Sequence, residues 1–293
     1  PTAIGKTALA IQLAQFYQTE IISADSRQFF KEMNIGTAKP SEEELAAAPH
    51  HFINSHSVKT LLSTGDFEVQ SLKLMESLFT KHNQLIMVGG SGLYIDAVCK
   101  GLDDLPDIDL KIRESLNQKL ANDGIEAIKA QLQELDPEYY EKVDQANPQR
   151  MIRGLEVVLS TGKKLSSFLT AKKKERPFKI VKIGLNTDRA VLYDSINHRV
   201  DLMMEAGLLD EVNSLIPFRK YNALNTVGYA EIFDYLEGKT ELADAVAMIK
   251  QNTRRFAKRQ LTWFRRDEET VWFEPNQTDE IIKYLSGVCH SKE

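Results

Sequence analysis

The first seven residues, PTAIGKT, have the composition of a loop that binds phosphates. Gly5 lets the backbone approach an anion, Lys6 is placed to neutralise it, and Thr7 offers a hydroxyl to a Mg²⁺ ion. The loop lacks the first glycine of the full G-x-x-x-x-G-K-[ST] pattern, and a GKT sequence also arises by chance. The neighbouring elements must therefore decide whether a diphosphate or triphosphate binds here.

A helix over Thr7 to Tyr17 is expected directly after this loop. Leu9, Leu13 and Phe16 recur at helical spacing and share one face. The N-terminal N–H groups of such a helix would point at a bound phosphate. Loops of this kind normally follow a buried strand, so we expect the first strand of the fold to be missing from this sequence.

A short apolar segment, Glu20 to Ala24, predicts a strand of a parallel sheet and ends in the polar sequence DSRQ. Since ligands bind outside the carboxyl ends of such strands, Asp25, Ser26 and Gln28 should face the same crevice as the phosphate loop. Alternatively, Asp25 or Ser26 is the N-cap of a helix that begins near Arg27.

A second strand is predicted over Leu85 to Val88, and the sequence GGSGLY follows it. An ATPase commonly has an aspartate at the end of such a strand to organise Mg²⁺ and water. Glycines stand there instead, which indicates that the bound phosphates are a leaving group and that nucleotide hydrolysis is not the purpose. The glycines would let a ligand approach the backbone, with Ser91 as a contact; an ordinary strand-to-helix turn is the alternative.

Helical spacing without a strand candidate runs from Asp109 to Asn147 and predicts an all-helical insertion. A further helix, Asn147 to Leu159, opens with an N-cap and a proline. Gln149 and Arg153 lie four residues apart on its polar face, which fits either a solvated surface or a binding surface. Arg113 lies on the polar side of the insertion, where a solvated residue is commoner than a contact.

Basic residues concentrate in a C-terminal helix predicted over Asp244 to Arg265. The chain has a net charge of −5, yet Lys250 to Arg266 contains seven basic residues and no acidic one. Phe256 and Trp263 are interleaved with these cations. Like charges four residues apart destabilise an isolated helix, so the crowding favours a polyanionic partner such as nucleic acid.

Two more strands are predicted, over Phe178 to Leu185 and Thr270 to Phe273. A helix expected from Asp188 to Ala206, ending at Gly207, follows the first of them. It carries Arg199, whose guanidinium is a candidate to close over phosphates.

The 293 residues, 42% of them hydrophobic, predict a folded globular protein. The two cysteines lie far apart, which indicates no disulfide framework and favours a reducing compartment. No apolar run reaches about 18 residues and no signal peptide is evident, so we expect a cytoplasmic protein with no membrane partner. His50, His51 and His56 lack partners at zinc spacing, so we expect them to pack in a loop.

Taken in order, these segments closely resemble the tRNA dimethylallyltransferase family, also called tRNA isopentenyltransferases. The resemblance covers nearly the whole chain and rests on PTAIGKT, SADSRQFF, MNIGTAKP, PHHF, GGSGLYI, NPQRMIRGLEV, RVDLMMEAGLLDEV, TVGYAEI and TRRFAKRQLTWFRRD. It implies an α/β fold: a P-loop NTPase-like parallel sheet flanked by helices, with an all-helical insertion domain. We expect residues 1–108 and 148–293 to form the core with the catalytic channel, residues 109–147 to grip the anticodon stem, and the protein to be a monomer.

The resemblance also implies a reaction. A dimethylallyl group would pass from dimethylallyl diphosphate to N6 of adenosine 37 in tRNAs that read codons beginning with U. Asp25 would be the general base for N6, while Arg199 and a Mg²⁺ held by Thr7 would neutralise the departing diphosphate. The loop residues that would hold the diphosphate are Thr2, Ala3, Ile4, Gly5, Lys6 and Thr7.

The family's tRNA contacts also transfer by motif to this sequence. They would be made by Asp25, Ser26, Arg27, Gln28, Ser91, Arg113, Gln149, Arg150, Met151, Ile152 and Arg153. Two positions depart from the family pattern: Ser91 stands where threonine is usual, and Ser195 where arginine is common. The first keeps the hydroxyl, whereas the second would weaken tRNA or phosphate contacts.

Three other classes remain open from the sequence. An adenylate isopentenyltransferase shares the loop and the base but prenylates free AMP, ADP or ATP; the helical insertion and the basic helix favour tRNA over these nucleotides. A P-loop nucleoside or nucleotide kinase would transfer phosphate from ATP. A non-catalytic RNA-binding protein would keep its function without Asp25.

Overall fold

The computed structural model describes residues 1–60, 62–106, 108–170 and 173–290. These residues form two compact units. The first unit contains Pro1–Cys99 and Arg176–Glu293, and the second contains Lys100–Glu175. The chain therefore leaves the first unit once and returns to it.

The first unit alternates short strands with helices. Its N-terminal part contains α1 (Lys6–Tyr17), β1 (Ile21–Ser23), the 3-10 helix η1 (Ile35–Thr37), α2 (Glu42–Ala47), β2 (His50–His51), α3 (Thr64–Leu78), β3 (Ile86–Val88) and α4 (Gly92–Lys100). Its C-terminal part contains β4 (Lys182–Leu185), α8 (Arg189–Glu205), α9 (Leu208–Ser214), η3 (Ile216–Phe218), η4 (Asn222–Leu224), α10 (Tyr229–Leu236), α11 (Leu242–Phe264), β5 (Thr270–Phe273) and α12 (Thr278–His290). The helices predicted after the loop, before Gly207 and in the basic segment are confirmed.

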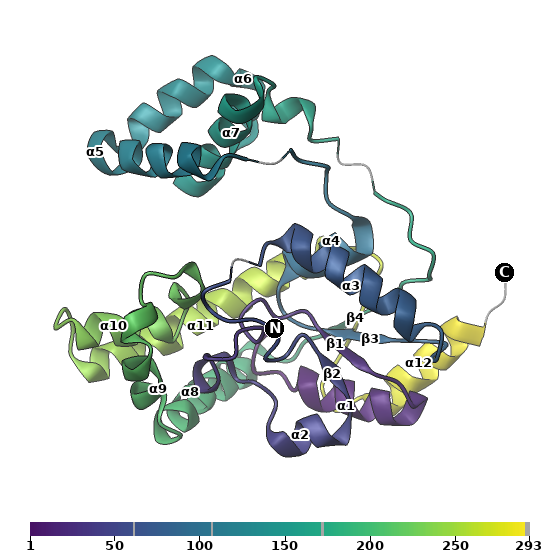
Figure 1. The fold of residues 1–293 in the computed structure, drawn as a ribbon. Helices are drawn as coiled ribbons and strands as arrows, with labels where there is room; N and C mark the ends of the chain where they lie inside the picture. The colour runs from purple at the N-terminus through teal and green to yellow at the C-terminus, as the bar shows by residue number, and fades with distance from the viewer. Residues whose placement is uncertain (61, 107, 171–172, 291–293) are drawn as a thin grey trace. The chain divides into compact units, whose positions relative to one another are not determined.

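The central strand β1 belongs to a parallel sheet with the order β2-β1-β3. Ile21 pairs with His50 on one side and with Ile86 on the other. Because successive side chains of a strand point to opposite faces, Ile21 packs with α1, whereas Ile22 packs with α3 and α4. Figure 1 shows the strands between these helices. The parallel register brings the carboxyl ends of β1 and β3 to one edge.

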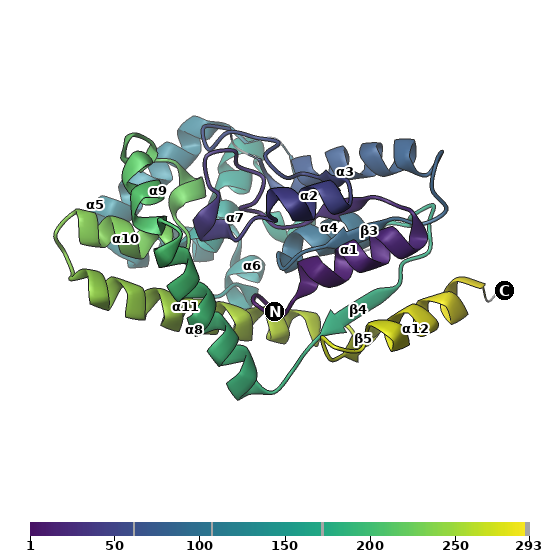
Figure 2. The same cartoon turned by 90° about the horizontal axis from the view of Figure 1, so that it is seen from below.

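A second parallel pair is formed by β4 and β5, in which Gly184 lies opposite Trp272. One apolar cluster joins this pair to α1, α8, α11 and α12 through residues that include Leu9, Ile196 and Ile281. Figure 2 shows α12 beside the two strands. Among the described residues, hydrogen bonds join the strands into two parallel sets and not into a single sheet.

The carboxylate of Glu211, on α9, holds the segment that contains η1. Glu211 accepts hydrogen bonds from the backbone N–H groups of Asn34, Ile35 and Gly36 at 3.0, 2.7 and 3.1 Å. It also accepts the phenol O–H of Tyr229 at 2.6 Å. Burial and the neighbouring Glu211 carboxylate raise the pKa of Tyr229, so the phenol stays protonated and donates. One side chain thus joins η1, α9 and α10.

The second unit is all-helical, as predicted. It contains α5 (Leu110–Leu135), α6 (Pro137–Lys142), α7 (Pro148–Thr161) and the 3-10 helix η2 (Leu165–Ser167). Asp109, Asp136 and Asn147 each cap the helix that follows by accepting a backbone N–H. These three helices lie together in Figure 1.

This unit is wider than the insertion expected over residues 109–147. A buried core joins α5 to α7 through Leu116, Ile128, Leu132, Met151, Ile152 and Leu155. The helix α7 therefore packs with the helical unit, and not with the core as expected for residues 148–293. The sequence could not decide this, because the apolar face of α7 would fit either core.

Two local expectations differ from the structure. Phe16, predicted to share one face of α1 with Leu9 and Leu13, is 57% exposed, while Leu9 and Leu13 are buried. The sequence predicts a loop at His50 and His51, whereas the structure pairs both residues with β1. A strand of two residues is too short to give an alternating pattern, so the sequence carried no signal for it.

We expect Glu211→Ala to lower the free energy of unfolding by about 2 kcal/mol or more, because several backbone N–H groups lose their acceptor at once. Urea denaturation followed by circular dichroism measures this change. The exposed Glu205→Ala, at the end of α8, is the matched control and should change the free energy of unfolding by less than about 0.5 kcal/mol. Equal effects of the two substitutions would contradict the role given to Glu211.

Candidate active site

The phosphate loop adopts a turn that few residues other than glycine favour. Gly5 has a φ of 88° and is the N-cap of α1, and Ala3 has a φ of 59°. No side chain caps the N-terminus of α1. The loop conformation therefore exposes the first turn of α1 to an anion that can complete its hydrogen bonding.

Two cationic side chains surround this turn. The Lys6 Nζ donates to the backbone oxygen of Pro1 at 2.5 Å, and the Arg199 guanidinium lies 3.4 Å from the Thr2 hydroxyl. Burial lowers the pKa of Lys6 to about 8; the Asp25 carboxylate raises it and the Arg199 guanidinium lowers it. Burial also lowers the pKa of Arg199, although an arginine stays charged. Charges of like sign are therefore held together out of water, an arrangement that a bound anion would stabilise.

Asp25 begins a tight turn at the carboxyl end of β1. Its Oδ1 accepts hydrogen bonds from the backbone N–H groups of Arg27 and Gln28 at 3.0 and 3.4 Å. No helix begins here among the described residues, so Asp25 does not have the helix N-cap role that was the alternative. The turn uses one carboxylate oxygen and holds the group beside Lys6.

Both the amide nitrogen and the carbonyl oxygen of the Gln28 side chain are hydrogen-bonded within the protein. Its Nε2 donates to the backbone oxygens of Thr37 and Ala38 at 3.2 and 3.0 Å, and its Oε1 accepts from the Ser23 hydroxyl at 3.4 Å. Both amide hydrogens are therefore occupied. Arg27 is partly buried near Asp25 and Tyr94, and burial lowers its pKa.

Ser91 meets the Asp25 turn from the end of β3. Its Oγ accepts from the backbone N–H of Ser26 at 3.0 Å and donates to the Ser26 hydroxyl at 3.1 Å. These hydrogen bonds join the end of β3 to the turn that follows β1. The lack of a side chain at Gly89, however, lets the protein backbone approach, and not a ligand: a Cβ on Gly89 would lie 2.3 Å from the backbone oxygen of Ala24.

The inner face of α11 packs on the same glycine-rich segment. Gln260 is 5% exposed and hydrogen-bonds to Gly90, while the Trp263 Nε1 donates to Asp96 at 2.9 Å. A Cβ on Gly92 would lie 2.4 Å from the Trp263 ring. Sequence reasoning missed Gln260, and the only signal was a neutral polar residue on the apolar side of a strongly basic helix.

The outer face of α11 carries most of the basic residues. Arg255, Lys258 and Arg259 are exposed, as are Arg265 and Arg266 just after the helix. The other two cations are partnered within the unit: Lys250 bonds to Asp201 at 2.6 Å, and Arg254 to Asn197 at 2.6 Å. Five exposed positive charges therefore lie on α11 and just after it.

The remaining predicted contacts lie in the second unit. Gln149 and Arg150 are exposed at the start of α7. Arg113 forms a bidentate ion pair with the fully buried carboxylate of Glu156, and Arg153 approaches the same carboxylate at 3.5 Å. Arg113 is thus a paired residue and not simply a solvated one.

The structure corrects the prediction that Met151 and Ile152 contact tRNA. Their exposed fractions are 0% and 1%, and both belong to the core between α5 and α7. Their side chains cannot face RNA, so we assign them to positioning Gln149, Arg150 and Arg153 on the outer side of the same helix.

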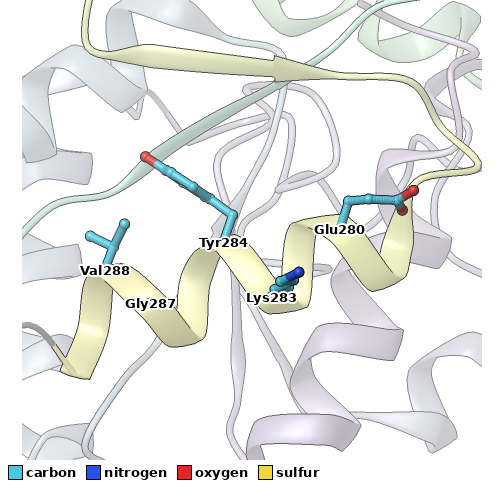
Figure 3. A pocket seen from close by; sticks show the side chains of 5 residues that line it. All are labelled: Glu280, Lys283, Tyr284, Gly287 and Val288. Atoms are coloured by element: carbon cyan, nitrogen blue, oxygen red, sulfur yellow. The ribbon is translucent and has the colours of Figure 1, made fainter.

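A shallow surface hollow lies on α12. It is lined by Glu280, Lys283, Tyr284, Gly287 and Val288, all from one helix (Figure 3). None of the predicted site residues lines it.

No described helix is both long and apolar enough to cross a membrane. Within the described ranges, no group of three or more His, Cys, Asp or Glu side chains is arranged to hold a metal. A phosphate loop, two cations and a carboxylate at the carboxyl ends of parallel strands define the class as an α/β enzyme that binds a phosphorylated substrate.

The chain belongs to the IPP transferase family, whose model matches residues 28–267. It is 56% identical over 288 residues to the tRNA dimethylallyltransferase of Christiangramia forsetii, covering 98% of this chain and 95% of that one. The tRNA isopentenylpyrophosphate transferase of Bacillus halodurans has a similar structure, with a TM-score of 0.72 and 36% identity over 99% of this chain and 94% of that one. A eukaryotic dimethylallyltransferase acting on tRNA gives a TM-score of 0.79 at 25% identity, covering 98% of this chain and 75% of that one.

We expect the protein to take up a proton when it binds diphosphate at a pH near or above 8. The Lys6 ammonium loses its proton near that pH in the free protein, and a bound anion favours the charged form. Affinity should therefore weaken above pH 8. Isothermal titration calorimetry in two buffers of different ionisation enthalpy measures the uptake. Lys6→Met is the control, and the same uptake in that variant would contradict the assignment.

Proposed function

We propose that this chain transfers the dimethylallyl group of dimethylallyl diphosphate to N6 of adenosine 37 in tRNAs that read codons beginning with U. The observation that carries the proposal is the convergence of Lys6, Arg199 and Asp25 beside the phosphate loop. The relatives are named tRNA dimethylallyltransferases, which favours tRNA over free adenine nucleotides as the acceptor.

The diphosphate would lie on the loop from Thr2 to Thr7. The backbone N–H groups at the start of α1 donate to its oxygens, and Lys6 and Arg199 neutralise its charge. Since the allylic C–O bond breaks as the diphosphate leaves, negative charge grows on the leaving oxygen. Cations placed around that oxygen lower the barrier to its departure.

Asp25 would act on the acceptor. The lone pair of an adenine amine is delocalised into the ring, so N6 is a weak nucleophile. A carboxylate held by the Arg27 and Gln28 N–H groups at the sheet edge can accept the N6 proton as the C–N bond forms. Because Gln28 is fully bonded within the protein, we assign it to orienting this turn.

A Mg²⁺ ion fits the donors that the loop offers. The Thr7 hydroxyl lies in the first turn of α1, and the diphosphate itself would supply the remaining oxygens. When bound, the ion would stabilise the charge on the leaving diphosphate. The protein would need only Thr7 as a direct ligand.

The tRNA would contact both units. In the first unit, phosphates of the tRNA would lie on the exposed cations of α11, and the target adenosine would lie at the turn that holds Asp25, Ser26 and Ser91. In the second unit, Gln149, Arg150 and the pair of Arg113 and Arg153 would meet the anticodon stem. Such contacts to phosphates fix the register of the RNA. We expect a monomer to perform the reaction in the cytoplasm.

The proposal predicts that Asp25→Ala lowers kcat by on the order of 100-fold or more, since removal of a general base has effects of that size. The assay is mass spectrometry of nucleosides from an anticodon stem-loop with three adenosines after U35, incubated with Mg²⁺, dimethylallyl diphosphate and competing AMP. A gain of C5H8 on the RNA adenosine is expected. Transfer to AMP alone, or an Asp25→Ala variant as active as the wild type, would overturn the proposal.

Removal of the Thr7 hydroxyl tests the metal assignment separately. We expect Thr7→Val to raise the Mg²⁺ concentration for half-maximal rate about 10-fold, as loss of a metal-site partner typically does. The exposed Ala8→Ser, one residue further along α1, is the matched control. An unchanged Mg²⁺ requirement in Thr7→Val would remove Thr7 from the metal site.

A further inference from the structure

Gln260 is a buried polar residue on a helix that carries several exposed cations. It lies on the inner side of α11 and is 5% exposed, whereas its neighbours Lys258 and Arg259 are exposed. A glutamine in such a position must satisfy both its carbonyl and its amide group inside the protein.

The carboxamide of Gln260 joins two loops that are distant in the sequence. Its Oε1 accepts the backbone N–H of Thr2 at 2.7 Å, and its Nε2 donates to the backbone oxygen of Gly90 at 2.9 Å. These partners are 258 and 170 residues away along the chain. Only a group that both donates and accepts can make this bridge.

The Gln260 carboxamide packs closely against the backbone at Gly90. A Cβ on Gly90 would lie 2.1 Å from the Nε2 of Gln260. The same Thr2 whose N–H is held by Gln260 receives Arg199 at its hydroxyl, at 3.4 Å. The bridge therefore fixes the start of a loop that contains two positive φ angles, at Ala3 and Gly5.

We propose that Gln260 is a positioning residue for the diphosphate, resting on the function proposed above. Its carboxamide ties the phosphate loop to the glycine-rich segment that carries Ser91, and so sets the distance between the diphosphate and the acceptor side of the site. Gln260 acts through Thr2 and Gly90 and does not touch the substrate. The inner face of α11 thus serves the diphosphate, while its outer face carries the cations proposed for tRNA.

Gln260→Met tests this role, because methionine has a similar length and removes both hydrogen bonds. We expect the KM for dimethylallyl diphosphate to rise by on the order of 10-fold and kcat to fall, since small displacements in a site are costly. The KM for the anticodon stem-loop should stay within about 2-fold. Gly90→Ala perturbs the bridge from its other end, because the added Cβ displaces Nε2, and should give the same split.

Asn252→Leu is the matched control. Asn252 also lies on α11 and donates from its side-chain amide to Glu231 at 2.7 Å, so its loss lowers stability without reaching the phosphate loop. Its Tm should fall while its KM for dimethylallyl diphosphate remains that of the wild type. If Gln260→Met and Gly90→Ala change both KM values alike, or change neither, the positioning role is wrong.

A binding measurement separates this proposal from the proposed function. Calorimetric titration with inorganic diphosphate and Mg²⁺ needs no turnover, and we expect Gln260→Met to bind on the order of 10-fold more weakly than the wild type. Weaker binding in an assay where the wild type transfers no C5 unit would support the bridge and reject the reaction. Equal binding by the two proteins would reject the bridge, whatever the activity.

Discussion

The close contact between the ends of β1 and β3 is the constraint on which the site depends. A Cβ on Gly89 would lie 2.3 Å from the Ala24 backbone oxygen, so the two strand ends approach each other only because Gly89 has no side chain. The approach lets the Ser91 hydroxyl reach Ser26 and brings Gly90 within 2.9 Å of Gln260. The positions of Ser91 and Gly90 therefore depend on the close backbone contact between Gly89 and Ala24.

Charge is distributed so that the interior of the site favours an anion and the exterior favours a polyanion. Lys6 and Arg199 are held together beside the loop, where burial lowers the pKa of both groups. Desolvated cations of like sign are unfavourable until a diphosphate neutralises them. Outside, the exposed face of α11 presents cations to solvent, where attraction to phosphates acts over longer range and weakens with salt. The inner cations come from α1 and α8, and the outer ones from α11 and the residues just after it.

The sequence predicted the features that local patterns encode. Periodicity located the main helices, apolar segments located β1 and β3, and the order of motifs indicated the family and the sheet edge with Asp25 and Ser91. The hydrogen bonds of the Gln260 carboxamide and of the Glu211 carboxylate were not predicted. Each joins partners far apart in the chain, which leave no local pattern in the sequence. Motif transfer also included Met151 and Ile152 without regard to burial, and only packing shows that they form a core.

The most direct test of this account is a crystal structure of the chain with an unreactive thio analogue of dimethylallyl diphosphate, Mg²⁺ and an anticodon stem-loop. The account predicts that the diphosphate lies on the loop from Thr2 to Thr7 with Arg199 against it, and that N6 of the target adenine lies about 3 Å from the Asp25 carboxylate. A diphosphate bound elsewhere, or an adenine whose N6 faces a different group, would contradict it.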